Sequence, residues 1–468
     1  MYALTALLWS GLSIAVIASS VACDQSGAVG GIRQSARILG DYDMEIREAH
    51  PRADGIRHVD TPRTLAKLRE AHVTTYFYLI FHAQTDWTDL QEEFLPAAER
   101  EGIDVWVYLV PPSECCSQPF GVDFIRWSTE IARLSLRHRN LRGWAMDDFK
   151  SNLATFTPEY TEAMRSTARR INPELEFFPV LYQRDYVPAF LSAYAAHFDG
   201  AIFPYTVDFD EFNGVAGALQ QSRAAVERFG LDLILMVYAT KMSVAQYPPS
   251  PAYVAGALGA GVTAMRRGEI RGVVTYAMAK EFQVEACGFA HHLNLTVPSE
   301  TPTSAGDFVE ATQAVGIDPL AASYQLRFSE QDSYPVGTAG YHFKQLLVNG
   351  RTVWSTDVAS DPALAWTEHV VELTPYVKGA SRATISFRLY DKKGVSNFGV
   401  RMSIGGMSAS GVRLENPDFT QETGWRFAQQ GPGSARYAYH VCNPDRQRQV
   451  YEAVRQLYGR VGSGNFHP

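Results

Sequence analysis

Between residues 36 and 290, short apolar runs alternate with longer amphipathic stretches. The runs are rich in Val, Ile, Phe and Tyr, as buried parallel strands are. Eight of them occur, at 38–41, 74–81, 104–110, 141–147, 176–181, 201–205, 231–238 and 272–278. Eight strand–helix repeats over about 250 residues predict an α/β fold, a (β/α)8 barrel. A doubly wound open sheet is the alternative, but no Gly-x-Gly-x-x-Gly follows the first run.

The pattern changes after Pro298, where residues 299–304 are rich in Ser, Thr and Pro. Beyond them, apolar and polar residues alternate, and Asn349-Gly350 is a typical hairpin turn. This half predicts an all-β sandwich. We expect the barrel at 36–297, a linker at 298–319, the sandwich at 320–432 and a helical segment at 433–468, with one amphipathic helix over 443–460.

The first residues are typical of an export signal. Residues 4–22 are almost wholly apolar and end in small residues before Cys23. This pattern predicts a lipoprotein-like signal peptide at 1–22 and lipidation of Cys23, with a cleaved secretory signal and an uncleaved anchor as alternatives. Each alternative exports the protein, to the cell surface or periplasm or into the medium. Membrane contact is then expected only through the N-terminal lipid or anchor.

The amino-acid composition limits the classes of ligand that we expect the chain to bind. The net charge of −8 argues against nucleic acid. The 23 Tyr, 25 Phe and 8 Trp suit a protein that stacks sugar rings, although aromatic residues also build cores. No Cys-x-x-Cys or His-Glu-x-x-His occurs, so we expect no metal and no cofactor. Cys115 and Cys116 lie side by side in the sequence; they form a flat disulfide surface, stay as thiols, or one pairs with Cys287.

Catalytic residues of a barrel lie at the carboxyl ends of its strands. The fourth run ends in Gly143-Trp144-Ala145-Met146-Asp147-Asp148-Phe149. Alternation puts Asp147 on the face of two small residues, which leaves room beside it. We predict Asp147 and Asp148 as the essential acids, with Asp208, after the sixth run, as the third. The alternative is that one aspartate caps a helix and the other faces solvent.

The 143–149 stretch resembles the fourth strand of TIM-barrel glycoside hydrolases, in which a carboxylate ends a Gly-apolar-Asp pattern. It differs from the chitinase pattern, because Phe149 and Ala145 stand where that pattern has Glu and Asp. Residues 345–354, with Trp366 and 371–374, resemble the jelly-roll accessory domains of polysaccharide-degrading enzymes. The resemblance implies a glycoside hydrolase, with a carbohydrate substrate and two carboxyl groups as acid and as base or nucleophile.

Other polar and aromatic residues follow the strands and are expected to bind substrate. They are Asp41, Asp43, His82, Trp87, Tyr182, Tyr205, Asp210, Tyr238, Lys241, Tyr276 and Glu281. A hard cation held by Asp41, Asp43 and Asp147 is an alternative use of three of these acids. Two rival functions remain: a glycan-binding lipoprotein without catalysis, and a polysaccharide lyase with Tyr238 or Lys241 as base.

Overall fold

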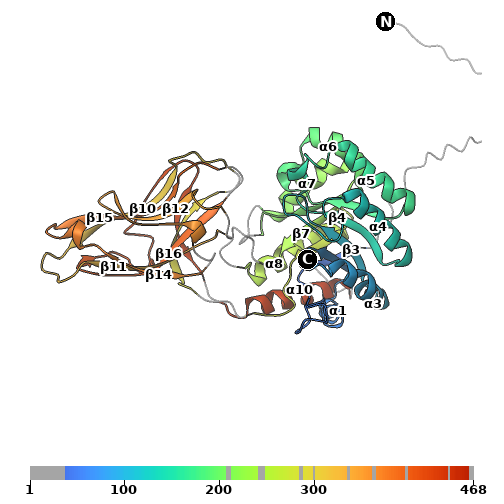
Figure 1. Ribbon diagram of the computed structural model, residues 1–468, viewed down its shortest axis with the longest axis horizontal. Helices are drawn as coiled ribbons and strands as arrows, with labels where there is room; N and C mark the ends of the chain where they lie inside the picture. Colours follow the sequence, from blue (N-terminus) through green and yellow to red (C-terminus); the bar gives the residue numbers. More distant parts are fainter. Residues whose placement is uncertain are drawn as a thin grey trace, which may run out of the picture. The chain divides into compact units, whose positions relative to one another are not determined.

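The computed structural model (Figure 1) describes residues 37–206, 212–240, 248–283, 288–298, 301–334, 338–360, 365–395, 399–440 and 443–462. The expected signal peptide and Cys23 lie outside these residues. Among the helices that are described, none has the length and apolarity that a membrane span requires.

Eight parallel strands form the first sheet, as predicted. They are β1 (Ile38–Tyr42), β2 (Thr75–Ile80), β3 (Asp104–Leu109), β4 (Leu141–Met146), β5 (Glu176–Pro179), β6 (Gly200–Pro204), β7 (Asp232–Tyr238) and β8 (Gly272–Tyr276). Their order is β5-β4-β3-β2-β1-β8-β7-β6. A parallel bridge between Val180 and Ile202 joins the two outer strands and closes the barrel. Closure explains why the strands are apolar on both faces.

Helices follow the strands and cover the outside of the barrel (Figure 1). They are α1 (Thr61–Glu70), α2 (Asp86–Asp89), α3 (Leu95–Arg100), α4 (Phe124–Arg137), α5 (Pro158–Ile171), α6 (Pro188–Tyr194), α7 (Val215–Glu227) and α8 (Pro251–Arg266), with short turns η1 (Leu90–Phe94), η2 (Phe149–Asn152), η3 (Gln183–Asp185) and η4 (Ala195–His197). Local chemistry sets their starts: the Asp60 side chain accepts from the backbone N–H of Arg63, and Thr157 accepts from Tyr160. Each start has Pro in the first turn.

The barrel has two apolar layers. Tyr42, Trp106, Tyr108 and Phe178 belong to the interior cluster, whereas a larger cluster lies between strands and helices. Gly143 shows how tightly the interior is filled, because a Cβ there would lie 2.8 Å from the Trp106 ring. The interior is therefore a packed core, and only the ends of the strands are open for chemistry.

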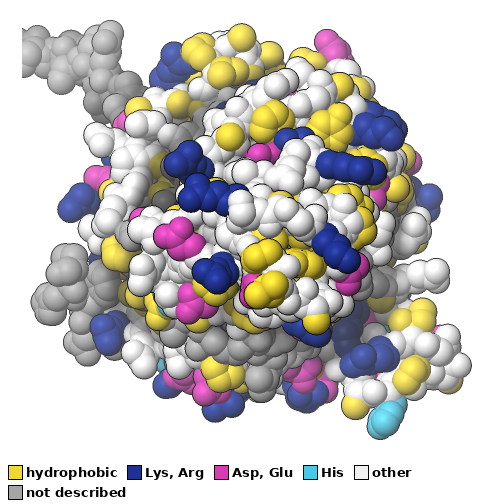
Figure 2. Space-filling view, turned by 90° about the vertical axis from the view of Figure 1, so that its left-hand side faces the viewer, with side chains coloured by type: hydrophobic (Ala, Val, Ile, Leu, Met, Phe, Trp, Pro, Cys, Tyr) yellow, Lys and Arg dark blue, Asp and Glu magenta, His cyan; other side chains and the backbone are white. Residues whose placement is uncertain are grey.

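The second half folds as two antiparallel sheets around one core, which confirms the predicted sandwich. One sheet contains β13 (Arg351–Asp357), β12 (His342–Val348), β15 (Arg382–Asp391), β10 (Phe308–Ile317), β17 (Val412–Arg413) and β18 (Arg426–Gln430). The other contains β14 (Thr367–Glu372), β11 (Gln325–Asp332), β16 (Val400–Ser410), β9 (His291–Val297) and β19 (Ser434–Tyr439). The turns η5 (Val358–Ser360) and α9 (Thr374–Val377) join strands. The face in Figure 2 intersperses basic, acidic and apolar side chains, a mixture typical of a solvated surface.

The domain boundaries differ from those expected. Strand β9 lies in the stretch assigned to the barrel, yet it pairs with β16 and β19. Strand β10 lies in the expected linker, and β19 lies in the segment expected to be helical. The reason is sheet pairing: each strand needs partners from distant parts of the chain, and residues 299–304 alone carry the composition of a linker.

Helix α10 (Arg446–Gly462), after the sandwich, returns to the barrel. Its buried face, Val450, Tyr451, Val454, Leu457 and Tyr458, belongs to the layer around the barrel strands. The Tyr451 hydroxyl donates to the carbonyl of Lys67 at 2.8 Å, and the Tyr458 hydroxyl donates to that of Gly40 at 2.9 Å. Helix α10 is therefore part of the barrel's core.

We predict that Tyr458→Ala lowers the free energy of unfolding by about 3 to 5 kcal/mol, because it opens a cavity and removes a buried hydrogen bond. Urea unfolding of the full chain measures the change. Tyr439→Ala is the matched control, since that side chain is 65% exposed, and it should change stability by less than about 1 kcal/mol. Equal effects of the two variants would contradict the role of α10.

Candidate active site

Asp147 stands at the mouth of the barrel. Along β4, Ala145 faces the interior and Trp144 and Met146 face the helices, as the alternation predicts. The backbone N–H of Asp147 donates to the carbonyl of Leu109 at 3.1 Å, which extends the pairing of β4 with β3 by one residue. Asp147 is thereby held on the interior side, at the point where the packed core ends.

Asp148 follows in the left-handed region, at φ 38° and ψ 39°. This conformation costs roughly 1 kcal/mol or more outside glycine and concentrates at functional sites. Asp148 precedes η2, but its side chain makes no capping hydrogen bond, and its Oδ1 is buried with no hydrogen-bond partner among the described residues. Its backbone N–H donates to Asp147 Oδ1 at 2.9 Å. Asp148 therefore does not act as a helix cap.

The surroundings of Asp147 favour its protonated form. Burial, followed by the negative charges of Asp148 and Glu114, raises the pKa of Asp147 to about 8, from an ordinary 3.8. The backbone N–H of Asp148 and the Tyr108 hydroxyl offset part of this rise. At neutral pH, Asp147 thus carries a proton and can donate it.

Tyrosines line the mouth around Asp147. Burial raises the pKa of each of their hydroxyls, and the charge of Asp147 raises it further, for Tyr42, Tyr108, Tyr182, Tyr238 and Tyr276. The rings contact one another: the centroids of Tyr42 and Tyr108 are 4.2 Å apart, and those of Tyr238 and Tyr276 are 4.5 Å apart. Tyr182 also lies against Asp148. The predicted residues Tyr182, Tyr238 and Tyr276 are therefore brought together with Asp147.

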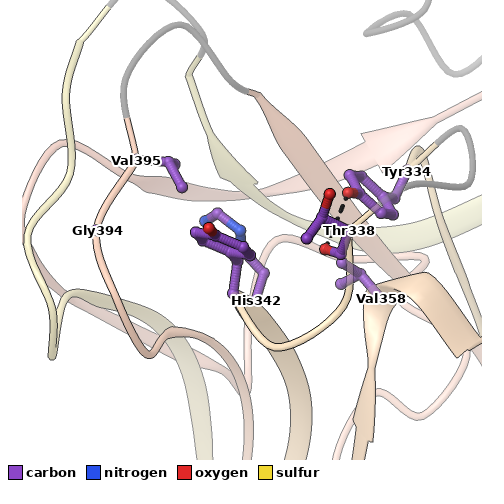
Figure 3. Close-up of a pocket in the computed structure, with 7 residues that line it drawn as sticks. Tyr334, Thr338, His342, Val358, Gly394 and Val395 are labelled. Atoms are coloured by element: carbon purple, nitrogen blue, oxygen red, sulfur yellow. Dashed lines mark hydrogen bonds between the residues drawn. The ribbon is translucent and has the colours of Figure 1, made fainter.

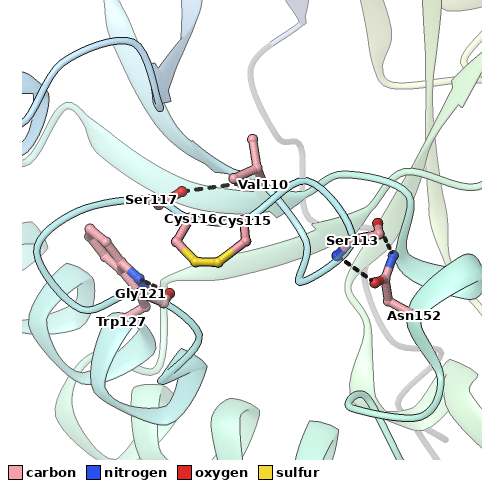
Figure 4. The surroundings of a disulfide bond; sticks show 8 residues. All are labelled: Val110, Ser113, Cys115, Cys116, Ser117, Gly121, Trp127 and Asn152. Atoms are coloured by element: carbon pink, nitrogen blue, oxygen red, sulfur yellow. Dashed lines mark hydrogen bonds between the residues drawn. A yellow bond between two sulfur atoms is a disulfide. The ribbon is translucent and has the colours of Figure 1, made fainter. Parts of the chain in front are cut away.

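Glu114 is a third acid at this site, on the loop after β3. Burial and the charge of Asp148 raise its pKa. Asn152 joins the Glu114 loop to the end of β4. Asn152 Nδ2 donates to Ser113 Oγ at 3.0 Å, and Asn152 Oδ1 accepts from the Ser113 N–H at 3.1 Å (Figure 4). Asn152 Nδ2 also donates to the carbonyl of Asp148 at 3.0 Å. The hydrogen bonds between the two loops thus hold Glu114 in position.

The same loop carries the two neighbouring cysteines. Cys115 and Cys116 are joined by a disulfide, so they are neither free thiols nor paired with Cys287, which lies outside the described residues (Figure 4). Cys115 is exposed and Cys116 half-buried. Next to the loop's end, Ser117 Oγ accepts from the Val110 N–H at 3.3 Å. The disulfide therefore presents a small apolar surface beside Glu114.

A second polar cluster lies after β1 and β2. His82 Nε2 lies 2.7 Å from Asp43 Oδ1. Although burial acts to raise the pKa of Asp43, the hydrogen bond from His82 and its charge lower it, and the same hydrogen bond raises the pKa of His82. Burial and the charge of Asp43 raise the pKa of Glu45 to about 7.

Asp41 forms a separate buried pair. Lys280 Nζ lies 2.5 Å from Asp41 Oδ2, and Thr275 Oγ1 donates to Asp41 Oδ1 at 2.6 Å. Burial raises the pKa of Asp41, and Lys280 opposes the rise. Lys280 also donates to the carbonyl of Asp43 at 2.8 Å. Asp41 thus supports the strand ends and does not face the open mouth, as its full burial indicates.

Three predicted binding residues lie elsewhere. Trp87 packs edge-on against Trp127 in the outer core, at 5.1 Å between ring centroids. Tyr205 is buried in the same layer, because alternation along β6 puts it on the outward side with Phe203. Glu281 is 54% exposed and pairs with Arg63. None of the three belongs to the tyrosine-lined mouth.

Asp208, Asp210 and Lys241 lie outside the described residues. Sequence analysis missed four residues of the mouth: Tyr42, Tyr108, Glu114 and Glu45. Tyr108 had a usable signal, since it alternates with Trp106 along β3 and so faces the interior. Glu114 had a weaker one, an acid directly after a strand.

The sandwich has a cavity of a different character. It measures about 360 Å³ and is lined by Tyr334, Thr338, Tyr341, His342, Val358, Gly394 and Val395 (Figure 3). The Tyr334 hydroxyl donates to the carbonyl of Thr338 at 3.2 Å. None of the described residues that line this cavity carries a carboxylate.

Comparisons with known proteins give weak similarities. No family model matches the chain, and no curated protein matches it. A solved glucosidase from Croceicoccus marinus is 12% identical, with 80% of this chain and 96% of that chain covered at a TM-score of 0.39. A putative alpha-L-fucosidase from Bacteroides thetaiotaomicron is 11% identical, with 52% and 88% covered at 0.35. These scores carry no argument about activity, which rests on the site itself.

The raised pKa of Asp147 predicts a pH-dependent stability. Between about pH 4 and 8 the folded chain keeps a proton that the unfolded chain releases, so stability falls as pH rises through this window. The Asp147→Asn variant has no carboxyl group to ionise, so this residue no longer lowers its stability as pH rises. Its side-chain oxygen can still accept the hydrogen bond from the backbone N–H of Asp148. We expect its stability advantage over wild type to grow from about pH 5 to about pH 8.5 in urea unfolding.

The control is Glu227→Gln, an exposed carboxylate at the end of α7 whose partner is Arg223. It should leave the pH dependence of wild type unchanged. An Asp147→Asn variant whose stability runs parallel to wild type at both pH values would show that Asp147 is not held protonated.

Proposed function

We propose that the chain is a glycoside hydrolase that cleaves a polysaccharide or oligosaccharide at the carboxyl face of its barrel. The observation that carries the proposal is Asp147, with a pKa of about 8, directly beside Asp148. Hydrolysis of a glycosidic bond requires a carboxylic acid that holds its proton and a second carboxylate that does not. Asp147 meets the first part of this requirement, and we assign the second part to the adjacent Asp148.

The proposed roles follow from the charges. Asp147 donates its proton to the glycosidic oxygen as the bond to the anomeric carbon breaks. Asp148 attacks that carbon or takes a proton from the attacking water. Glu114 is the alternative residue for this role, because its charge also acts on Asp147. If Asp148 attacks, water then cleaves the bond between the sugar and Asp148, and Asp147 takes the proton of this water and is restored. If Asp148 acts as the base, it takes the proton of the attacking water, and exchange with solvent returns Asp148 to its carboxylate and Asp147 to its acid form.

The tyrosines support a carbohydrate substrate. Tyr182 and Tyr276 are half-buried, so their rings offer faces on which the C–H groups of a sugar stack, whereas the rings of Tyr42, Tyr108 and Tyr238 are buried beneath them. Cys115–Cys116 adds an apolar surface at the rim. Together they suit a polyhydroxylated ligand that is apolar on its ring faces.

A lyase is the less favoured alternative. Its base must lose a proton near neutral pH, yet burial and the charges of Tyr276 and Asp147 raise the pKa of Tyr238 well above 10. The other candidate base, Lys241, lies outside the described residues. A barrel that only binds glycans remains the second rival, and turnover separates it from a hydrolase.

We also propose that the protein is exported as a lipoprotein, with the sandwich as an accessory domain. The apolar run at 4–22 before Cys23 supports export. Membrane contact would then pass through the N-terminal lipid alone.

Reducing-sugar release on a panel of bacterial, plant and fungal polysaccharides tests the activity. We expect release by wild type, and a loss of roughly 100- to 10,000-fold in Asp147→Asn and Asp148→Asn. Glu227→Gln, far from the mouth on α7, should match wild type. Unsaturated products that absorb in the ultraviolet would instead identify a lyase, and equal release by all variants would refute the assigned site.

An aryl glycoside with an acidic leaving group separates the roles, because the departing phenolate needs no proton. Asp147→Asn should lose much less activity on it than on the polysaccharide, whereas Asp148→Asn should lose activity on both. For wild type, kcat/KM on the polysaccharide should fall as pH rises through about 8, where Asp147 loses its proton. An Asp147→Asn variant with equal losses on both substrates would contradict the acid role.

A further inference from the structure

Three side chains of the ligand type converge after β1 and β2. They are Asp43, Glu45 and His82, and one ligand atom from each lies within 4.8 Å of the other two. Two carboxylates and an imidazole make a donor set that divalent cations accept. Convergence alone is common on protein surfaces, so the state of each side chain decides whether a cation belongs there.

The state of Glu45 is the main observation in favour of a bound cation. It is 8% exposed, and neither of its carboxylate oxygens has a hydrogen-bond partner among the described residues. A buried carboxylate without hydrogen bonds or a counter-charge is strongly unfavourable in a folded chain. One carboxylate oxygen of Glu45 lies within 4.8 Å of the ligand atoms of Asp43 and His82, so an ion at the centre of the cluster would be within reach of all three residues.

The two nearby basic side chains, Arg47 and Lys280, each form an ion pair with another acid, although Arg47 Nη2 makes no hydrogen bond among the described residues. Arg47 Nη1 donates to Asp86 at 2.7 Å, and Lys280 lies 2.5 Å from Asp41. Both lie close enough to act on the charge of Glu45, but neither makes a hydrogen bond to it. Within the cluster, the one imidazole of His82 is hydrogen-bonded to Asp43, and no basic group is hydrogen-bonded to Glu45 among the described residues.

A second cluster of the same residue types gives a contrast. His58, Asp89 and Glu93 also bring their ligand atoms within 4.8 Å. Both clusters contain a hydrogen bond between histidine and aspartate, at 2.6 Å from His58 to Asp89 and at 2.7 Å from His82 to Asp43. The glutamates differ, because Glu93 pairs with Arg52 at 2.5 Å, whereas the oxygens of Glu45 have no hydrogen-bond partner among the described residues. In the second cluster these partners satisfy the side chains, and the position that a cation would take is already used.

We propose that Asp43, Glu45 and His82 bind a divalent cation of the class that takes carboxylate and imidazole ligands together, such as Mn²⁺ or Zn²⁺. An imidazole ligand disfavours Ca²⁺, which prefers oxygen alone. Glu45 and His82 line an open cavity of about 850 Å³, through which the ion and its remaining water ligands reach the cluster. The sequence predicted no metal, with a hard cation held by Asp41, Asp43 and Asp147 as the alternative, and of these three only Asp43 belongs to the present cluster.

The proposal predicts one saturable Mn²⁺ site in the full chain after treatment with a chelator. The electron paramagnetic resonance signal of free Mn²⁺ measures binding, with no glycan present. We expect Glu45→Gln and His82→Ala each to weaken binding at least tenfold. Zn²⁺ should displace Mn²⁺, whereas a tenfold excess of Ca²⁺ should not. Glu93→Gln, from the satisfied cluster, is the matched control and should bind as wild type does.

Two outcomes would overturn the proposal: no binding by wild type up to about 1 mM Mn²⁺, the limit of a weak site, or unchanged binding in both Glu45→Gln and His82→Ala. His82→Ala keeps the test decisive if Glu45→Gln does not fold, since the His82 side chain is 43% exposed. Asp147→Asn should bind Mn²⁺ normally, so this result is independent of the proposed hydrolase activity.

Discussion

The closed ladder of parallel strands is the constraint on which the site depends. Closure forces every second residue of each strand into a packed interior, where Trp106 leaves no space beside Gly143 and Phe178 leaves none beside Gly200. Charged groups are excluded from this core and can stand only where it ends. Asp147 occupies the first such position on β4, and its hydrogen bond to Leu109 keeps it in the strand's register. Its high pKa is a consequence of that position.

The same argument explains which parts of the site could be predicted. The strands and the orientation of Asp147 follow from local patterns of apolar and small residues, which are visible in the sequence. Tyr205 was misplaced because a residue near a strand end can face either the mouth or the helices, and one step along the strand reverses the side. Trp87 was misplaced because it lies on helix α2, where it packs against Trp127 in the outer core. Glu114 could not be ranked, because its position depends on Asn152, which joins two loops distant in sequence.

The predicted boundaries of the sandwich differ from the observed ones for a related reason. Strand β9 pairs with β16 and β19, which lie more than a hundred residues further along the chain. Nothing in the composition of residues 291–297 distinguishes a last barrel strand from a first sandwich strand. Long-range pairing decides between them, and a single sequence contains no direct record of it.

The barrel mouth gathers acids at two places, and the structure resolves their repulsion in different ways. At β4, Asp148 and Glu114 crowd Asp147, and the carboxyl group keeps its proton. At β1, His82 compensates Asp43, whereas burial and the charge of Asp43 raise the pKa of Glu45 to about 7, and the oxygens of Glu45 have no hydrogen-bond partner among the described residues. A proton held against its ordinary pKa can be given to a substrate, whereas an uncompensated carboxylate attracts a cation. One apolar barrel thus supports two distinct chemistries, because each strand end meets a different set of neighbours.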